Sequence, residues 1–183
     1  MDKKIFIITG AAGTGKTTVC NYLCDHFKMA RVITHTTRPP RKYEVNGRDY
    51  YFETAKSFAH HHFLESVQYD HHRYGSSYEG LDAAFRKSPR ICIVLDTKGA
   101  LTYLNQIHDL VTIIYLTASK HSLENRMIER GDDIDKIKNR LCSHENQRDQ
   151  TLPNSLIGKA TSIDNDNWAR TRKVLNRLMQ VKL

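Results

Sequence analysis

The feature that most constrains the fold is a glycine-rich segment that follows an apolar run and precedes a helical pattern. Residues 10–17 read GAAGTGKT and match G-x-x-x-x-G-K-[ST] at every fixed position. Residues 4–9 (KIFIIT) predict a buried parallel strand, and residues 16–28 predict a helix. Glycines let the backbone wrap closely with its N–H groups pointing inward, and the helix N-terminus aims its positive dipole end at the same point. The segment therefore predicts a phosphate-binding loop.

Lys16 and Thr17 close this loop, and each has a defined task in such motifs. The lysine ammonium places a charge between the β- and γ-phosphates of a nucleotide, and the threonine hydroxyl can bind Mg²⁺. A plain turn joining strand to helix is the alternative, and the complete match in its context argues against it. The motif leaves the phosphoryl acceptor open. The residues expected to cradle the phosphates are Gly10, Ala11, Ala12, Gly13, Thr14, Gly15, Lys16, Thr17 and Thr18.

The rest of the chain alternates strand and helix patterns, which predicts one α/β domain in 183 residues. This alternation favours a doubly wound parallel sheet with right-handed crossovers. The stretch 35–88 breaks the rhythm with prolines and polar residues, which indicates an insertion on the scaffold. Strands are expected at 31–34, 50–52, 66–69, 91–95, 110–116 and 160–164, and helices at 79–87, 119–129, 135–147 and 168–181.

Composition narrows the class of protein. The apolar run at 5–8 is too short for a signal-peptide core or a membrane span, so we expect a soluble cytoplasmic protein without a membrane partner. The net charge of +8 would suit nucleic acid, but no recognition helix, zinc finger or aromatic-basic sheet signature accompanies it. A protein that binds two nucleotides also needs many cations, so we expect no nucleic acid as partner.

Two groups of potential metal ligands are present. Cys20 and Cys24 lie one helical turn apart, but no second pair accompanies them, so buried packing of reduced thiols is the favoured interpretation for the four cysteines. Histidines at 60–62, with two more at 71–72, invite a metal hypothesis. Consecutive residues cannot all point at one ion, and we expect a solvated helix face there.

The second informative segment runs from 34 to 52 and reads THTTRPPRKYEVNGRDYYF. Arg38 and Arg41 stand three residues apart in a loop stiffened by two prolines. Their guanidinium groups can hold one phosphate through bidentate hydrogen bonds, and Tyr50 and Tyr74 can add hydroxyl donors. A solvated basic loop would be the expected interpretation if the segment stood alone.

The segment does not stand alone. It resembles the guanylate kinase signature S-x-T-T-R-x-P-R-x-x-E-x-x-G-x-D-Y-x-F, and the likeness continues in order over roughly residues 4–141, with a weak echo at 164–166. This resemblance implies a P-loop NTPase-type fold that transfers a phosphoryl group from ATP to GMP. Further matches are Glu65, Tyr74-Gly75-Ser76, Asp96-x-x-Gly99, Arg126, Arg130-Gly131 and Arg140-Leu141.

The resemblance also implies which residues meet GMP. Guanine donates from N1–H and its amine, which carboxylates accept, whereas adenine has a bare N1 and lacks the 2-amino group, so the same site rejects it. Family members hold the GMP phosphate with the residues that match Arg38, Arg41, Tyr50 and Tyr74. They read the guanine ring with those that match Thr34, Glu65, Ser76 and Asp96.

Arginines that match Arg126, Arg130 and Arg140 belong to the lid and hinge of the family. They close over the ATP phosphates and neutralise charge on the transferring group. We therefore expect Lys16, Arg130 and Arg140 to be catalytic and Arg126 to bind ATP. An exposed helix that happens to carry arginines is the alternative for each.

The implied layout is a single kinase domain that works as a monomer or homodimer. Its core would comprise 1–34, 89–126 and 147–183, with a mixed α/β GMP-binding insertion at 35–88 and a helical lid at 127–146.

The sequence departs from the family pattern at several positions. Val94 replaces the first aspartate of L-D-x-D, which removes a carboxylate expected near Mg²⁺. Lys98 replaces a glutamine and could pair with Asp96, and Tyr43 stands where glycine is common.

Two alternative functions stay open: a divergent P-loop kinase for another small phosphorylated acceptor, and a non-catalytic guanylate-kinase-like interaction module. The base-reading carboxylates argue against the first, and the intact phosphate loop argues against the second.

Overall fold

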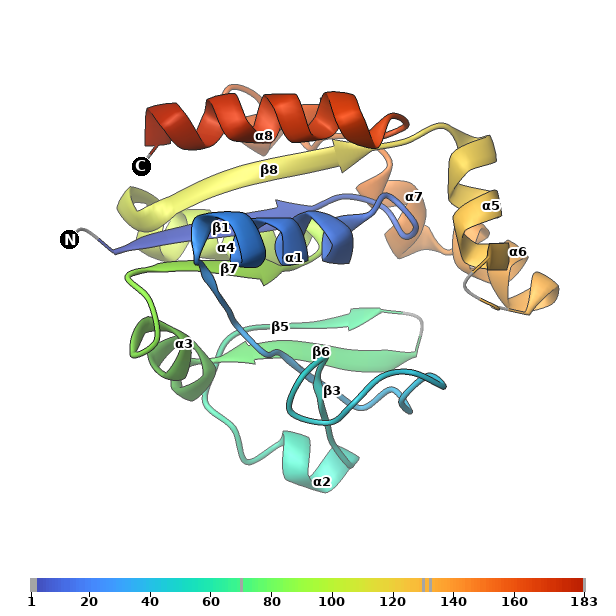
Figure 1. Cartoon of the computed structure of the whole chain (residues 1–183). Coiled ribbons are helices and arrows are strands. Elements are labelled where there is room, and N and C mark those ends of the chain that lie inside the picture. The colour runs from blue at the N-terminus through green and yellow to red at the C-terminus, as the bar shows by residue number, and fades with distance from the viewer. Residues whose placement is uncertain (1–2, 70, 130, 132, 183) are drawn as a thin grey trace.

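The computed structural model describes residues 3–69, 71–129, 131 and 133–182. Its centre is a five-stranded parallel sheet in the order β2-β7-β1-β8-β9 (Figure 1). Because β1 lies in the middle, the glycine-rich loop after it opens at the centre of the carboxyl edge of the sheet. This is the doubly wound α/β architecture expected from the sequence. The strands are β1 (Lys4–Thr9), β2 (Ala30–Arg31), β7 (Arg90–Val94), β8 (Val111–Thr117) and β9 (Ala160–Asp164).

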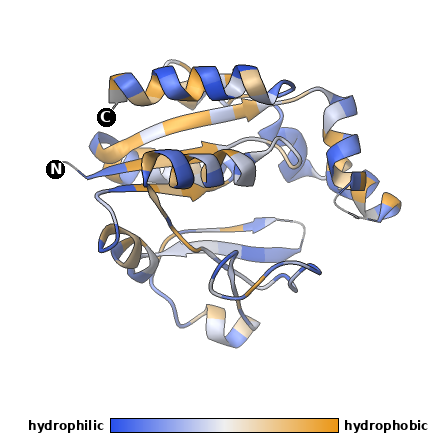
Figure 2. Cartoon of the chain, in the orientation of Figure 1, coloured by the Kyte–Doolittle hydropathy of each residue, from blue (hydrophilic) through white to orange (hydrophobic). Residues whose placement is uncertain are grey.

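The side chains of β1 alternate between two buried faces. Ile5 and Ile7 pack into one hydrophobic cluster, and Phe6 and Ile8 pack into the other. Figure 2 shows the central strands as predominantly hydrophobic, as expected where helices cover both faces of a sheet. The helices that contribute to the first cluster are α3 (Tyr78–Phe85) and α4 (Thr97–Ile107). Those that contribute to the second are α1 (Lys16–Phe27) and α8 (Trp168–Lys182).

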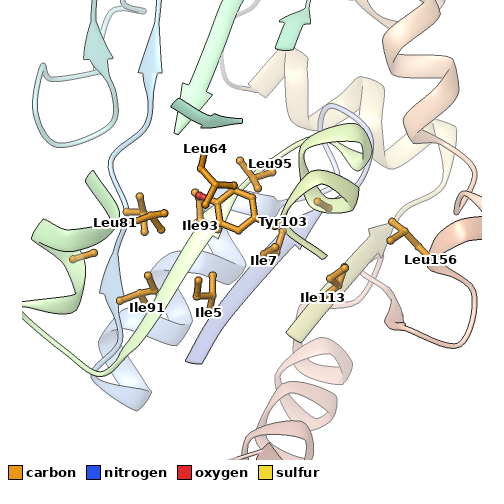
Figure 3. Packing of buried hydrophobic residues seen from close by; sticks show 13 residues of the cluster. Ile5, Ile7, Leu64, Leu81, Ile91, Ile93, Leu95, Tyr103, Ile113 and Leu156 are labelled. Carbon is orange, nitrogen blue, oxygen red and sulfur yellow. The ribbon is translucent and has the colours of Figure 1, made fainter. Parts of the chain in front are cut away.

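A second, mixed sheet in the order β4-β3-β6-β5 lies beside the core (Figure 1). Leu64 from this sheet reaches the first core cluster next to Tyr103 of α4 (Figure 3). Burial of such apolar side chains anchors the second sheet to the core. Its strands are β3 (His35–Thr36), β4 (Tyr51–Phe52), β5 (Phe63–Tyr69) and β6 (His72–Ser77), accompanied by the short helix α2 (Ala55–Phe58).

Three helices gather beyond the carboxyl edge of the central sheet, on the same side as the glycine-rich loop (Figure 1). They are α5 (Lys120–Glu129), α6 (Ile134–Cys142) and α7 (His144–Asp149). Two 3₁₀ turns complete the described elements, η1 (His108–Leu110) and η2 (Asn154–Leu156). Among the described residues, no helix combines the length and apolar character that a membrane crossing requires.

The elements expected from the sequence are present, with some differences. The expected helix at 135–147 is two helices, because the Ser143 side chain accepts from the N–H of Asn146 and starts α7. The expected strand at 31–34 pairs only at Ala30–Arg31, since the chain then leaves for the second sheet. The elements that the sequence did not predict include α4, β6 and the shorter β3 and α2.

The structure agrees with the predicted packing for two of the cysteines but not with the predicted helix for the histidines at 60–62. Cys20 and Cys92 are buried, which confirms packing, but Cys142 is exposed. The expectation of a helix at 60–62 is wrong, because these histidines follow α2 in a turn, whereas the expected solvent exposure holds for His60 and His62. His61 is only partly exposed and contacts Glu53.

Candidate active site

One cavity brings together residues from the phosphate loop, the second sheet and α6. Lys16 comes from the loop, Glu65 and Tyr74 from the second sheet, Asp96 from the end of β7, and Arg140 from α6. Thr34 and Tyr50 also line it. Residues as far apart in the chain as Gly10 and Asp149 thus meet where a parallel sheet ordinarily binds its ligands.

The phosphate loop has the conformation that its glycines permit. Gly10 and Gly15 have φ of 133° and 91°, and a Cβ on Gly10 would lie 2.2 Å from the carbonyl oxygen of Leu116. Lys16 Nζ donates to the carbonyl oxygens of Gly10 and Ala11, both at 2.7 Å. The loop therefore wraps around the ammonium group, and Thr17 and Thr18 lie exposed on the first turn of α1.

Side chains from distant helices and loops hold the phosphate loop in place. Asn146 Oδ1 accepts from the backbone N–H of Ala12 at 2.8 Å, and Asn165 Nδ2 donates to the carbonyl of Thr14 at 2.8 Å. Arg126 donates from Nη2 to the carbonyl of Asn165 at 2.5 Å and from Nη1 to the carbonyl of Gly13 at 3.4 Å. Arg126 thus lies against the phosphate loop.

Glu44 brings the two predicted phosphate-binding arginines together. Arg38 Nη2 donates to both carboxylate oxygens of Glu44 at 2.9 Å, and Arg41 Nη1 donates to Oε1 at 3.3 Å. The Arg38 guanidinium also lies 5.5 Å from the ring centroid of Tyr50, within cation–π range. The Tyr50 and Tyr74 rings are 6.1 Å apart in an edge contact. The four residues expected at the acceptor phosphate therefore form one neighbourhood.

Glu65 is the most unusual group in the cavity. Its side chain is buried, Oε1 accepts from the Ser76 hydroxyl at 3.2 Å, and Oε2 is buried without a hydrogen-bond partner. Burial, and then the neighbouring charge of Asp96, raise the pKa of Glu65 to about 8. An unpaired buried carboxylate oxygen is costly, and in a cavity wall it marks a position for a ligand donor.

Ser76 and Gly99 position the carboxylates from behind. Ser76 is fully buried, donates to Glu65 and accepts from the Tyr103 hydroxyl at 2.8 Å, so it holds Glu65 instead of lining the cavity. Gly99 leaves room for both acids, because a Cβ there would lie 3.1 Å from Glu65 Oε2 and 3.2 Å from Asp96 Oδ1. The sequence predicts that the Ser76 hydroxyl meets the base, and in the structure this hydroxyl contacts Glu65 and Tyr103.

Asp96 has a partner that sequence reasoning missed. Burial raises the pKa of Asp96, while Arg148 donates from Nη2 to its Oδ2 at 2.5 Å. The same Nη2 lies 2.9 Å from Oδ1 of Asp149, which also accepts from the Thr97 hydroxyl at 2.5 Å. The expected partner of Asp96, Lys98, is exposed instead. Arg148 and Asp96 lie 52 residues apart, so no local sequence pattern points to their contact.

Of the two arginines expected to be catalytic, Arg130 and Arg140, the structure describes Arg140. Arg140 of α6 lines the cavity, its Nε is buried without a hydrogen-bond partner, and its guanidinium lies 5.9 Å from the Tyr69 ring centroid. Arg130 lies outside the described residues. Val94 also lines the cavity, so an apolar side chain occupies the position where a carboxylate was expected.

Comparison with known proteins then decides the family. The guanylate kinase family model matches residues 2–181. The chain belongs to the guanylate kinase family. A guanylate kinase of Protochlamydia amoebophila is 38% identical over 154 residues, which covers 80% of this chain and 78% of that protein. A guanylate kinase of Neisseria meningitidis serogroup A is 32% identical over 181 residues, covering 96% and 86%.

A solved structure supports the fold independently. The crystal structure of guanylate kinase from Anaplasma phagocytophilum superposes with a TM-score of 0.68 at 18% identity, covering 99% of this chain and 86% of that one. The predicted resemblance, the α/β fold and the class of enzyme, a nucleoside monophosphate kinase of the guanylate kinase family, are confirmed.

Proposed function

We propose that this guanylate kinase family member transfers the γ-phosphoryl group of ATP to GMP and reads guanine through Glu65 and Asp96. The observation that carries the proposal is the unpaired Oε2 of Glu65 in a cavity that also contains the phosphate-loop lysine. Guanine N1–H and the 2-amino group are donors, and Glu65 offers them an acceptor that the protein leaves unused. Thr34 lines the same cavity and can donate its hydroxyl to O6.

The GMP phosphate would bind beside the arginine pair. Arg38 and Arg41 converge on the Glu44 carboxylate, whose negatively charged oxygens accept their hydrogen bonds as the oxygens of a phosphate would. Tyr50 and Tyr74 lie next to this pair and line the cavity, so their hydroxyls can reach the same phosphate. The proposed site therefore places base and phosphate of one nucleotide along the second sheet.

The transfer step needs alignment and charge stabilisation, with no protein nucleophile. A GMP phosphate oxygen attacks the γ-phosphorus in line, forming a new P–O bond as the bond to the β–γ bridging oxygen breaks, so that ADP and GDP result. Lys16 lines the cavity from the phosphate loop, and Arg140 lines it from α6. Both would stabilise negative charge on the equatorial oxygens of the transferring phosphoryl group. Arg126 and the loop residues 10–18 would hold ATP.

The chain offers few protein ligands for Mg²⁺, which suits an ion that is bound mainly by the nucleotide. Thr17 is exposed at the start of α1, where its hydroxyl is accessible to a nucleotide-bound ion, whereas Val94 offers no ligand. Mg²⁺ characteristically keeps several waters and takes its other ligands from substrate phosphates. The ion supplies neutralisation of phosphate charge when bound. We infer that Thr17 is its main protein ligand here.

The layout in three parts also belongs to this proposal. A core at 1–34, 89–126 and 147–183, an insertion at 35–88 and a lid at 127–146 are supported by the second sheet, whose strands all fall between His35 and Ser77, and by α6 within the lid range. We further propose a cytoplasmic enzyme that works as a monomer or homodimer.

Glu65→Gln tests the proposed base recognition. It keeps the shape of the side chain but replaces one acceptor oxygen by a donor nitrogen, so the KM for GMP should rise by tenfold to a hundredfold, on the order of 1.5–3 kcal/mol for a charge-assisted hydrogen bond. The preference for GMP over AMP should narrow. Glu79→Gln is the matched control, because Glu79 is an exposed glutamate outside the cavity. Unchanged kinetics in Glu65→Gln would contradict the guanine assignment.

A further inference from the structure

A second cluster of chemically reactive side chains lies in the second sheet. His35 is on β3, Glu53 follows β4, and His61 lies in the turn after α2. His35 Nδ1 is 3.0 Å from Glu53 Oε1, and His61 Nε2 is 2.9 Å from the same oxygen. The three potential ligand atoms lie within 4.8 Å of one another. None of the three residues lines the nucleotide cavity described above, so the proposed phosphoryl transfer does not use them.

We propose that His35, Glu53 and His61 bind one divalent transition-metal ion of the Zn²⁺ type through Nδ1, Oε1 and Nε2. Two imidazoles and one carboxylate are a ligand set that Zn²⁺ takes with an open fourth position. Ligands at tetrahedral angles, about 2.0–2.1 Å from the ion, are ~3.3 Å apart. The observed separations of 3.0 and 2.9 Å need an outward shift of only a few tenths of an ångström.

The surroundings of the cluster fit the pattern found around metal sites. The other ring nitrogen of His35, Nε2, is 3.0 Å from the Ser77 hydroxyl, and the other carboxylate oxygen of Glu53 accepts from the Ser57 hydroxyl at 2.5 Å. Ligating histidines and carboxylates ordinarily have such outer partners, which fix the orientation of the ligand atom. Here they leave Nδ1 of His35 and Oε1 of Glu53 facing each other at 3.0 Å.

Accessibility also suits an ion that enters from solvent. The side chains of His35, Glu53 and His61 are 6%, 15% and 31% exposed, so the cluster is closed on the His35 side and open on the His61 side. Tyr51 and Phe63 pack against His35 with ring centroids 5.0 and 5.6 Å away. His61 is the most exposed of the three, so a water that completes the coordination would enter most readily beside it.

The position of the cluster gives the ion a structural role. β3 and β4 have two residues each, and short strands contribute few ladder hydrogen bonds. A metal joining β3 to the segments around α2 would tie the small sheet together one residue away from Thr34 of the cavity. Because binding to the folded chain alone raises stability, metal should increase the Tm. Metal binding at this cluster does not depend on which nucleotide is phosphorylated.

Untagged full-length protein, treated with chelator and free of nucleotide, is titrated with Co²⁺ and then Zn²⁺ while visible absorption and Tm are followed. The wild type should take up one Co²⁺ per chain with tetrahedral d–d bands, and Zn²⁺ should displace it and raise the Tm. His61→Ala should weaken affinity by more than about 100-fold, because loss of an outer partner alone costs about 10- to 100-fold.

The controls are the neighbouring histidines. His60 is exposed and His62 pairs with Glu79, so His60→Ala and His62→Ala should bind metal like the wild type. A folded wild type that binds no Zn²⁺ at micromolar concentration would overturn the proposal and leave a purely hydrogen-bonded triad. Binding that survives His61→Ala, with the near-ultraviolet charge-transfer band of a cobalt thiolate, would also overturn it by placing the ion at Cys20, Cys24 and Cys92.

Discussion

Arg148 donates a hydrogen bond from Nη2 to Oδ2 of Asp96, joining α7 to the end of the strand that carries a proposed guanine ligand. Asp149 lies 2.9 Å from the same nitrogen, so one guanidinium serves the buried carboxylate of Asp149 and the partly buried one of Asp96. The ion pair with Arg148 holds the Asp96 side chain in place and offsets its negative charge. GMP would therefore meet Glu65 as the free acceptor and Asp96 as an acceptor already fixed in orientation.

Removing Arg148 should destabilise the fold. Arg148→Ala leaves Asp96 and Asp149 close together without their counter-charge, and breaking such a pair from one side costs roughly 2–4 kcal/mol when the site is partly accessible. Chemical denaturation of the variant beside Arg172→Ala, an exposed arginine on α8, measures this loss. Equal stability of the two variants would show that the Arg148 contacts contribute little.

The pH dependence of GMP binding should follow Glu65. With a pKa of about 8 the side chain is protonated in the free protein at neutral pH, and it must ionise to accept from guanine donors. Affinity for GMP should rise by up to about tenfold per pH unit from pH 6.5 towards 8, one proton being released per binding event. Calorimetry in buffers of different ionisation enthalpy measures that proton.

The raised pKa of Glu65 also predicts the direction in which the stability of the protein changes with pH. Its folded pKa is raised above the ordinary 4.5, so the stability that Glu65 contributes is fully present below pH 4.5 and is lost as the pH rises through about 8. The free energy of unfolding of the wild type relative to Glu65→Gln should fall by about 1.4 kcal/mol per pH unit in that window. Parallel pH profiles for the two proteins would mean that the Glu65 pKa is not raised.

Much of the fold could be read from the sequence because it depends on local patterns. The β1 run at 4–9 and the glycine motif at 10–17 define the central strand and loop without long-range information. Helix α4 was missed because it begins at Thr97-Lys98-Gly99, an unpromising first turn that Asp96 stabilises by accepting from the Gly99 N–H.

The site was harder to predict because its contacts join distant segments. Arg38 and Arg41 are close in sequence, and their convergence was foreseeable. The Arg148–Asp96 pair spans 52 residues, and no local pattern points to it. The role of Ser76 behind Glu65 likewise depends on how β5 and β6 pair, which no spacing along one strand reveals.

Lys16→Ala should abolish phosphoryl transfer while the protein stays folded. The lysine ammonium donates to the loop carbonyls of Gly10 and Ala11, and its proposed task is electrostatic. The variant should lose at least about a hundredfold in kcat, whereas Lys173→Ala, an exposed lysine on α8, should keep wild-type turnover. Near-normal kcat in folded Lys16→Ala would exclude the loop as donor site.

Binding of both nucleotides should draw the second sheet and α6 towards the core. Transfer requires a closed site that excludes water, and both elements carry cavity residues, Glu65 on one and Arg140 on the other. Small-angle scattering with a bisubstrate analogue should show a smaller radius of gyration than the free protein. An unchanged radius would argue against closure.

Product analysis with a panel of acceptors tests the central claim most directly. The wild-type protein is incubated with ATP, Mg²⁺ and one of GMP, AMP, CMP or UMP, and the nucleotides are separated and quantified. We predict that GDP and ADP appear one for one with GMP, at least about a hundredfold faster than diphosphate forms from AMP. Equal rates with GMP and AMP, or ADP formed without GDP, would contradict the account.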